Sequence, residues 1–254
     1  MPTLQKLVVL TLLLLVAACE TTPITGKKAF NIFSIEEDCA MGAEAYTQFT
    51  ADETVITTSW GDDGQWKQTV ETVMADLAAV AEDQGFEYEV KLLDNDGTVN
   101  AWCLPCGKMA VYTGILPVCQ DAAGLAVVMG HEIGHAIARH GTQRMSMDSI
   151  ASLGLELLGN EDYAALGAMA YEYGAALPFG RDHELEADHI GLILMARAGY
   201  DPREAVDFWT RMDALGSSGT PEWLSTHPSH ETRIQEIEAL LPQALEIYAS
   251  VQPK

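Results

Sequence analysis

The chain has 254 residues, of which 48% are hydrophobic, and a formal net charge of −23 at pH 7. This length suggests one domain with a tail and is sufficient to bury a substantial core. The 37 acidic residues far outnumber the 14 basic ones, which argues against nucleic acid as a partner and against electrostatic docking on anionic lipid.

The N-terminus has the features of a secretory signal. Lys6 precedes an apolar run over residues 7–18, which is too short to span a bilayer as a helix. Small residues end the run directly before Cys19, a pattern that resembles a bacterial lipobox and predicts lipidation of Cys19 as the first residue of the mature protein. A plain signal peptide followed by an incidental cysteine is the alternative.

On this interpretation the chain divides into three parts. Residues 1–18 form a lipoprotein signal peptide, residues 19–33 a lipidated polar tether, and residues 34–250 the folded domain. Glu20 follows the lipidated position, where Asp tends to retain lipoproteins in the inner membrane of enteric bacteria. The resemblance to lipoproteins therefore favours the periplasmic face of the outer membrane.

Helical patterns account for most of the domain. Ser34 and Glu37 have the spacing of a capping box, so a helix is expected from there to about Phe49. Alternating apolar residues around a turn at residues 94–97 indicate a small antiparallel sheet. The strands are expected over residues 86–93, 98–104 and 109–113, and further helices over residues 65–81, 141–176 (two helices), 201–212 and from about 229. These elements predict an α+β fold that is mostly α.

The most informative stretch is a run of small and apolar residues, 127–138, that holds His131, Glu132 and His135. Residues four apart lie on one face of a helix, so both imidazoles can point at a single ion. Glu132 is rotated away from that face and can reach a water on the ion without binding it. Two His ligands beside a carboxylate base are the arrangement of a hydrolytic zinc site.

A core helix with two satisfied histidines is the alternative explanation of this motif. Gly130, Gly134 and Ala138 form a small-residue stripe. Because glycine costs helix stability, such glycines suggest that another backbone approaches closely. A charged Glu132 in so apolar a run also needs a reason to be there. Both observations favour the zinc site.

A catalytic zinc site needs a third protein ligand and an open position for water. Glu184 and Asp188 share a helical face, so Glu184 can bind the ion while Asp188 accepts a hydrogen bond from a ligand His and fixes its tautomer. Glu186 points roughly the other way, and an acidic solvated helix is the alternative for this stretch. His140 is turned away from the ligand face, and we expect it to be only a cation near a helix C-terminus.

The two motifs together resemble the signature of the HtpX and CAAX-prenyl-protease type of gluzincin zinc metallopeptidases. The similarity is greatest to the periplasmic lipoprotein branch of that family, which is LoiP- and BepA-like, and it covers nearly the whole mature chain. It includes residues 100–114 ahead of the zinc helix, residues 177–181 before the third ligand, and a His-Pro loop at residues 226–233. Two positions depart from the family pattern, because Gly180 replaces the usual Ser and Cys106 the usual Gly.

The resemblance implies a zincin-like fold and a zinc-dependent endopeptidase with one Zn²⁺ per chain. An ion held by the two histidines of the motif and Glu184 lowers the pKa of a bound water toward neutrality. Glu132 then takes the proton of that water and returns it to the leaving amine. A cation or donor such as Arg233 or His227 assists in stabilising the oxyanion.

His227 precedes Pro228, which restricts it to an extended backbone, so it is expected on a loop. In the resembling proteins such a loop lies over the active-site cleft. A neutral imidazole there can occupy the fourth position of zinc and hold the enzyme latent, or it can donate to the oxyanion. A surface histidine beside a helix start is the third alternative. We favour the latch, because an unregulated protease would endanger outer-membrane precursors.

The resemblance also implies that an exposed edge strand pairs with an extended peptide and holds the scissile bond over the zinc. By that resemblance the strand contains Val99, Asn100, Ala101, Trp102 and Cys103. An ordinary hairpin protected by a loop is the alternative.

Besides Cys19, the chain has Cys39, Cys103, Cys106 and Cys119, in a compartment that permits disulfides. The Cys-x-x-Cys spacing of Cys103 and Cys106 is weak evidence for a metal site without a second such pair. We therefore expect a local disulfide between these two residues, although the connectivity is not encoded in the spacing.

We expect an enzyme that cleaves misfolded or envelope proteins in protein quality control. Its partners would be protein or peptide substrates, the membrane through the lipid at Cys19, and outer-membrane assembly proteins. A non-catalytic, chaperone-like lipoprotein that binds outer-membrane proteins is the alternative, and the intact Glu132 argues against it because a binder has no use for that base. A metal-storage module is disfavoured for the same reason.

Overall fold

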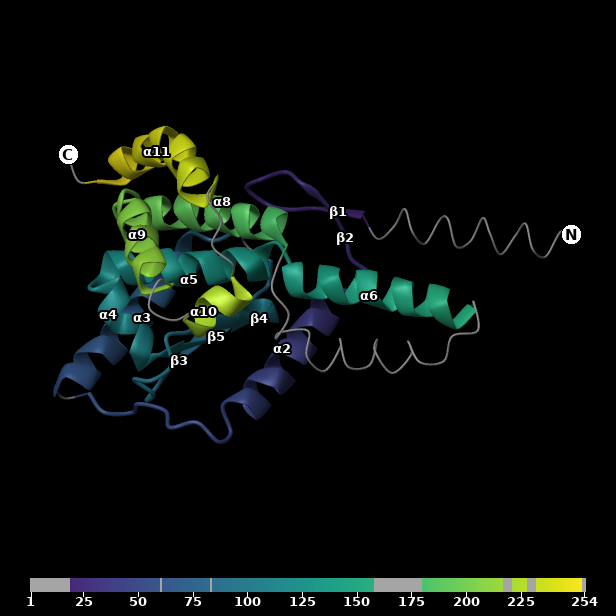
Figure 1. Ribbon diagram of the computed structural model, residues 1–254, viewed down its shortest axis with the longest axis horizontal. Helices are drawn as coiled ribbons and strands as arrows, with labels where there is room; N and C mark the ends of the chain where they lie inside the picture. The colour runs from purple at the N-terminus through teal and green to yellow at the C-terminus, as the bar shows by residue number, and fades with distance from the viewer. Residues whose placement is uncertain are drawn as a thin grey trace, which may run out of the picture.

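A computed structural model gives the structure of the chain, which Figure 1 shows. It describes residues 19–59, 61–82, 84–157, 180–216, 221–227 and 232–252. The expected signal peptide and the second of the two helices expected within residues 141–176 lie outside the described residues.

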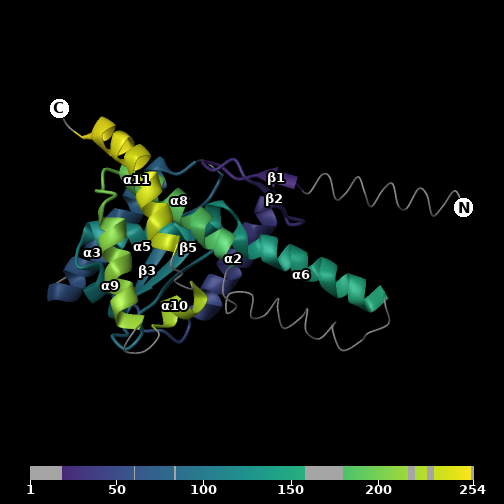
Figure 2. The same ribbon diagram turned by 45° about the horizontal axis from the view of Figure 1, so that its top comes forward.

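Helix α5 (Ala122–Ile137) occupies the centre of the fold, and its residues from 124 to 137 are all buried. Asp121 caps its N-terminus by accepting two backbone N–H groups of the first turn. Helix α8 (Arg181–Arg197) lies alongside α5, and α11 (Thr232–Val251) lies on the outer side of α8 (Figures 1 and 2). The expected motif helix is therefore the innermost helix of the domain.

The backbones of α5 and α8 touch through glycine. A Cβ atom added at Gly191 would lie 2.7 Å from the carbonyl carbon of Gly130, and one added at Gly134 would lie 2.7 Å from the carbonyl oxygen of Ala187. Real Cβ atoms do not approach that closely. The expectation that another backbone packs on the small-residue stripe is confirmed, and the partner is α8.

The sheet beside α5 has three strands in the order β3-β5-β4, with bounds Glu89–Leu93, Lys108–Tyr112 and Ala101–Leu104. Strand β4 is antiparallel to β5, but β3 is parallel to β5, so the expectation of a purely antiparallel sheet is wrong for β3. The turn after β3 does reverse the chain. The next strand, β4, does not pair with β3, because β5 lies between the two strands. As a result β4 lies at an edge of the sheet.

The N-terminal segment, expected as a polar tether, folds against the domain. Strands β1 (Cys19–Thr21) and β2 (Lys28–Phe30) form an antiparallel hairpin. Glu20 pairs with Arg139, and the Asn31 amide donates to the Thr142 hydroxyl across 2.8 Å. Polar contacts hold this segment in place, so it needs no periodic pattern of apolar residues.

The described cysteines do not form the expected local disulfide. Cys39 of α2 (Ile35–Phe49) is bonded to Cys106, while Cys103 and Cys119 are free. Cys106 lies in the short turn η1 (Pro105–Gly107) with a φ of 62°, which turns it from the strand direction toward α2. A left-handed residue here accounts for the glycine that is usual at this position in the resembling family. The same α2 begins at the predicted capping box of Ser34 and Glu37.

The helices over residues 61–80, 140–157 and 204–216 have the expected type and differ at their ends, whereas the short helical segments over residues 113–119 and 222–226 were not among the expected elements. Their bounds are α3 (Gly61–Val80), η2 (Thr113–Ile115), α4 (Leu116–Cys119), α6 (His140–Leu157), α9 (Glu204–Gly216) and α10 (Glu222–Thr226). Among the described residues, no single helix is long and apolar enough to cross a membrane; one pair of helices with a bend of 118° between them meets the criterion by length and composition alone. The chain is an α+β protein that is mostly α, as expected.

Candidate metal centre

Four buried side chains converge where α5, α8 and the end of α10 meet. They are His131 and His135 of α5, Glu184 of α8 and His227, and one potential ligand atom of each lies within 4.8 Å of all the others. His227 follows α10 directly and is 3% exposed, so the alternative of a surface histidine is wrong.

The spacing of these atoms fits a zinc ion. The Nε2 atoms of His131 and His135 are 3.1 Å apart, and Nδ1 of His227 is 3.3 Å from Nε2 of His131. The nearer carboxylate oxygen of Glu184 is 3.2 Å from Nδ1 of His227 and 3.4 Å from Nε2 of His135. A tetrahedral zinc with bonds of about 2.0–2.1 Å places its ligand atoms roughly 3.3 Å from one another. Imidazole nitrogens and a carboxylate oxygen are also the donors that zinc prefers.

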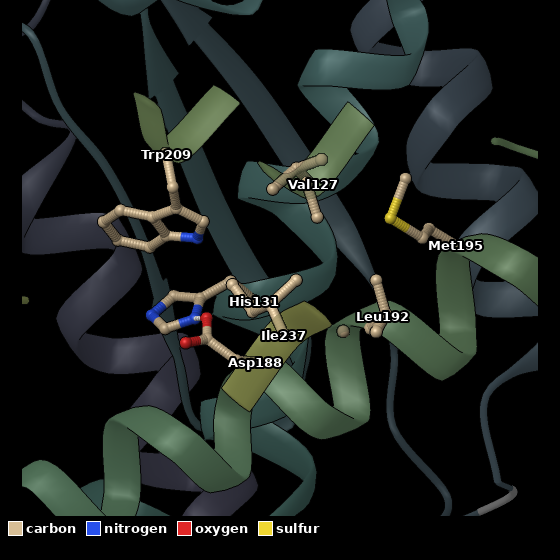
Figure 3. Close-up of a pocket in the computed structure, with 9 residues that line it drawn as sticks. Val127, His131, Asp188, Leu192, Met195, Trp209 and Ile237 are labelled. Carbon is tan, nitrogen blue, oxygen red and sulfur yellow. Dashed lines mark hydrogen bonds and ion pairs between the residues drawn. The ribbon is translucent and has the colours of Figure 1, made fainter. Parts of the chain in front are cut away.

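His131 contacts Asp188, the carboxylate that the sequence predicts to orient it. Its Nδ1 atom is 2.8 Å from a carboxylate oxygen of Asp188, so the N–H is on Nδ1 and the lone pair of Nε2 faces the cluster. Figure 3 shows the His131 ring next to this carboxylate, with Trp209 near the ring. The tautomer needed for a metal ligand is therefore fixed from outside the cluster.

Arg233 of α11 holds the two carboxylates of α8. It donates from Nε to Asp188 at 2.6 Å and from Nη1 to Glu184 at 2.9 Å, and its guanidinium carbon lies 3.5 Å from the centre of the Trp209 ring. The residue is fully buried. Its third nitrogen, Nη2, lies 2.8 Å from Asp188 and 3.1 Å from Nδ1 of His131, so the donors face the two carboxylates and the His131 ring.

The ionisation states suit metal binding. Burial raises the pKa of Glu184, but the neighbouring imidazoles of His135 and His227 outweigh it, so the pKa lies well below the usual range. Burial likewise raises the pKa of Asp188, and the charge of Arg233 brings it below normal. Burial lowers the pKa of His135, which stays a neutral imidazole. Both carboxylates are charged and His135 can offer a lone pair.

Glu132 is buried next to the cluster without belonging to it. Its Oε1 atom accepts the indole N–H of Trp223 at 2.8 Å and lies 3.3 Å from Nε2 of His227. A carboxylate therefore lies beside the cluster and outside it, at the position that the sequence predicts for the base. Sequence reasoning missed Trp223, although a buried tryptophan needs a partner for its N–H, and this one precedes His227 by one helical turn.

His140 and Glu186 differ from expectation. His140 is fully buried and its Nδ1 lies 2.9 Å from Nδ1 of His135, so it is not an exposed cation at a helix end. Burial lowers its pKa and favours the neutral form. Glu186 does point away from the metal cluster, as expected, but it is buried and lies 3.3 Å from Nε2 of His140. The sequence offered no partner for either residue.

The expected substrate strand lies beside α10. The carbonyl of Val99 accepts the backbone N–H of Trp223 at 3.2 Å, and the Asn100 amide donates to Glu222 at 3.3 Å. Trp102 packs edge-on against Tyr46 of α2. Ala101 and Cys103 belong to β4 itself. The contacts of Val99 and Asn100 therefore place α10 over the start of this edge strand.

Comparison with known proteins agrees with this geometry. Residues 62–241 match peptidase family M48. The mitochondrial metalloendopeptidase OMA1 of Schizosaccharomyces pombe is 35% identical over 239 residues, which are 89% of this chain and 67% of that protein. The human metalloendopeptidase OMA1 is 38% identical over 165 residues, covering 59% of this chain and 32% of that protein.

A bacterial relative has a different name. The Beta-barrel assembly-enhancing protease of Escherichia coli K12 is 27% identical over 233 residues, 86% of this chain and 47% of that protein. The chain thus spans about two thirds of the fission-yeast protein and half or less of the other two. The expectation of a zinc metallopeptidase is confirmed, and the chain belongs to peptidase family M48.

Proposed function

We propose that the chain is a zinc-dependent endopeptidase that cleaves misfolded or envelope proteins in protein quality control. His131, His135 and Glu184 are its zinc ligands, and Glu132 is its general base. The observation that carries this proposal is the buried set of ligand atoms within 4.8 Å of one another, with a carboxylate directly beside it that is not part of the set. A metal-storage site needs no such carboxylate.

The zinc, when bound, supplies the charge that allows a water to ionise near neutral pH and that polarises a peptide carbonyl. The chain supplies the proton transfers. Glu132 takes a proton from the attacking water and delivers it to the nitrogen of the leaving amine. Asp188 holds His131 in the tautomer that presents Nε2. Arg233 fixes Asp188 and Glu184, and we assign it this positioning role in place of the oxyanion role expected from the sequence.

His227 acts as a latch on this site. It supplies the fourth atom of the ligand set, and its Nε2 lies beside Glu132. In the same segment, Trp223 donates to Glu132 and its backbone N–H is bonded to Val99. The three contacts place α10 over the fourth metal position, the base and the start of the edge strand together. Substrate access therefore requires α10 to move.

The substrate is an extended peptide that pairs with β4. Within the described part of the chain this strand pairs only with β5 and lies at the sheet edge, and residues 99–103 lead into it and along it. Main-chain hydrogen bonds at such an edge bind peptides with little regard to sequence. That property suits an enzyme whose substrates are unfolded segments of many proteins.

Membrane attachment through lipid at Cys19 and a position on the periplasmic face of the outer membrane complete the proposal. The lipobox-like residues before Cys19 and the name of the Escherichia coli relative support it, whereas the mitochondrial names of other relatives do not. Mass spectrometry of the mature protein tests the lipid attachment by detecting acyl groups on Cys19. A Cys19→Ala variant is expected to lack both these acyl groups and the membrane association of the wild type.

Cleavage of casein and of unfolded outer-membrane proteins by the purified chain tests the activity. We expect cleavage that stops with a chelator, returns with zinc and is absent in Glu132→Gln. If zinc-loaded wild type and zinc-loaded His227→Ala both bind such proteins without cutting them, the endopeptidase proposal is overturned in favour of a chaperone-like binder.

A further inference from the structure

We propose that His140, Glu186 and Thr25 form a hydrogen-bonded relay that orients the zinc ligand His135 and makes the N-terminal hairpin a working part of the metal centre. The inference rests on the ligand role of His135 that is proposed above. In this relay His140 is a positioning residue, because it acts through His135.

The contacts form one continuous line. Nδ1 of His135 is 2.9 Å from Nδ1 of His140, and Nε2 of His140 is 3.3 Å from Oε2 of Glu186. The other oxygen of Glu186 accepts the hydroxyl of Thr25 at 2.5 Å. His135, His140 and Glu186 are all buried, so this line runs from the metal centre to the hairpin.

The direction of each hydrogen bond follows from chemistry. A His135 that binds metal through Nε2 carries its proton on Nδ1, which must donate. Nδ1 of His140 then has to accept, which places the proton of that ring on Nε2. Nε2 then donates to the carboxylate of Glu186, the acceptor that the described residues place beside it, and this carboxylate accepts at both oxygens. This arrangement of protons satisfies the three contacts of the relay, and it is the arrangement that presents the lone pair of His135 to the ion.

The way in which His135 is oriented resembles that of the other ligand histidine, His131. His131 receives its orientation directly from Asp188, two residues after Glu186 on α8. His135 lies one turn further along α5, where the interposed ring of His140 spans the distance to Glu186. Helix α8 therefore provides one orienting carboxylate for each histidine of the motif, directly for one and through an imidazole for the other.

The hairpin is fixed around the relay at two further points. Lys27, in the loop after Thr25, lies 3.7 Å from Glu186 and donates to the carbonyl of Asp182 at 3.4 Å. Arg139, the residue before His140, pairs with Glu20 and donates to the Phe33 carbonyl at 2.7 Å. These contacts hold Thr25 in place at the end of the relay.

Zinc affinity, measured by competition with a chromophoric chelator, tests the relay apart from activity. We expect His140→Phe and Glu186→Leu to raise the zinc dissociation constant about 10- to 100-fold. Glu186→Gln, which keeps an acceptor oxygen for His140, is expected to restore most of the affinity. Thr25→Val is expected to raise the constant about two- to tenfold. Thr210→Val is the matched control, because its hydroxyl bonds only its own helix, and we expect no change.

Two spectroscopic measurements separate positioning from general destabilisation. In the zinc-loaded, ¹⁵N-labelled wild type, we expect His140 to carry its proton on Nε2 and not on Nδ1. The visible absorption of the cobalt-substituted protein is expected to change in His140→Phe and Thr25→Val but not in Thr210→Val.

The proposal is overturned if His140 carries its proton on Nδ1, or if folded Thr25→Val and Glu186→Leu bind zinc as the wild type does. Because these two variants leave the ring of His140 itself unchanged, they decide the matter even if His140→Phe fails to fold. A wild type that binds no zinc would overturn the ligand assignment as well. Zinc binding without peptide cleavage would overturn only the proposed enzymatic function.

Discussion

Trp223 donates its indole N–H to Oε1 of Glu132 across 2.8 Å. The donor belongs to a five-residue helix that is followed at once by His227, so one short element holds both the proposed base and the fourth position of the metal cluster. The stacked rings of Trp223 and Trp209, 5.0 Å apart, fasten this element to α9. On the proposed latch role of His227, this is a closed arrangement of the site.

Glu132→Gln should keep zinc and fold but lose cleavage. Glutamine preserves the contact with Trp223 through its amide oxygen, yet it cannot take a proton from water. We expect a loss of roughly two to four orders of magnitude in kcat. Turnover numbers and zinc content of the same preparation provide the measurement, and near-normal turnover by the metal-loaded variant would contradict the mechanism.

Glu184→Ala and Glu186→Ala should differ in zinc binding, because Glu184 is the proposed zinc ligand and Glu186 only orients another ligand. The first removes a ligand atom and leaves Arg233 without one of its partners, so we expect loss of zinc. The second should still bind zinc at stoichiometric concentrations, with weaker affinity. Mass spectrometry under native conditions compares the two, and equal retention of zinc by both would show that the third ligand is misassigned.

His227→Ala distinguishes the two functional roles of this residue by sign. As a latch, its removal frees the fourth position and should raise basal proteolysis at unchanged zinc content. As an oxyanion donor, its removal should lower activity by roughly one to three orders of magnitude. Thr226→Ala is the control, because it disturbs the same helix without touching the cluster. Unchanged kinetics in His227→Ala would exclude both roles.

Loss of the disulfide between Cys39 and Cys106 should destabilise the fold. The bond closes a loop with a sequence separation of 67, so its removal releases considerable freedom in the unfolded chain. We expect Cys39→Ser with Cys106→Ser to lower the free energy of unfolding by about 2–5 kcal/mol in urea. Cys103→Ser is the matched control, since Cys103 is free. An equal effect in this control, or peptide mapping that links Cys103 to Cys106, would contradict the assignment.

Gly191→Ala should strain the contact between α5 and α8. The added methyl group would meet the backbone of residues 130 and 131, and neither helix can yield without moving a ligand. We expect a destabilisation of about 1–3 kcal/mol. Gly141→Ala on α6 meets no atom within 4 Å and should raise the stability by up to about 1 kcal/mol. A urea titration of both variants decides whether the close approach is real.

The parts of the metal centre that could be predicted from sequence are those that depend only on spacing within one helix. The positions of His131 and His135 follow from one helix, and those of Glu184 and Asp188 from a second, so spacing alone placed each pair on a face. Local chemistry also identified the capping box at Ser34. The two helices were linked by the need of a catalytic zinc for a third ligand and by the family resemblance, whereas the glycine stripe indicated a close neighbour but not which one.

The rest depends on contacts between segments far apart in the chain. The partner of Cys39 is set by the left-handed turn at Cys106, and the parallel pairing of β3 by the path of the chain around β5. His140 was misjudged because its surroundings come from α8 and from the hairpin, neither of which its own helix specifies. Such contacts leave no periodic signal in a single sequence.

The direct contact between the backbones of α5 and α8 has a consequence for metal exchange. The separation of the two helices is set by atoms of the main chain at Gly130, Gly134 and Gly191, and no bond to an ion is needed to maintain it. In small zinc domains the ion supplies the folding free energy, and chelation unfolds the chain. Here the ligands stay gathered by the packed helices, so the metal can be stripped and replaced, by zinc or by a spectroscopic substitute, in a protein that remains folded throughout.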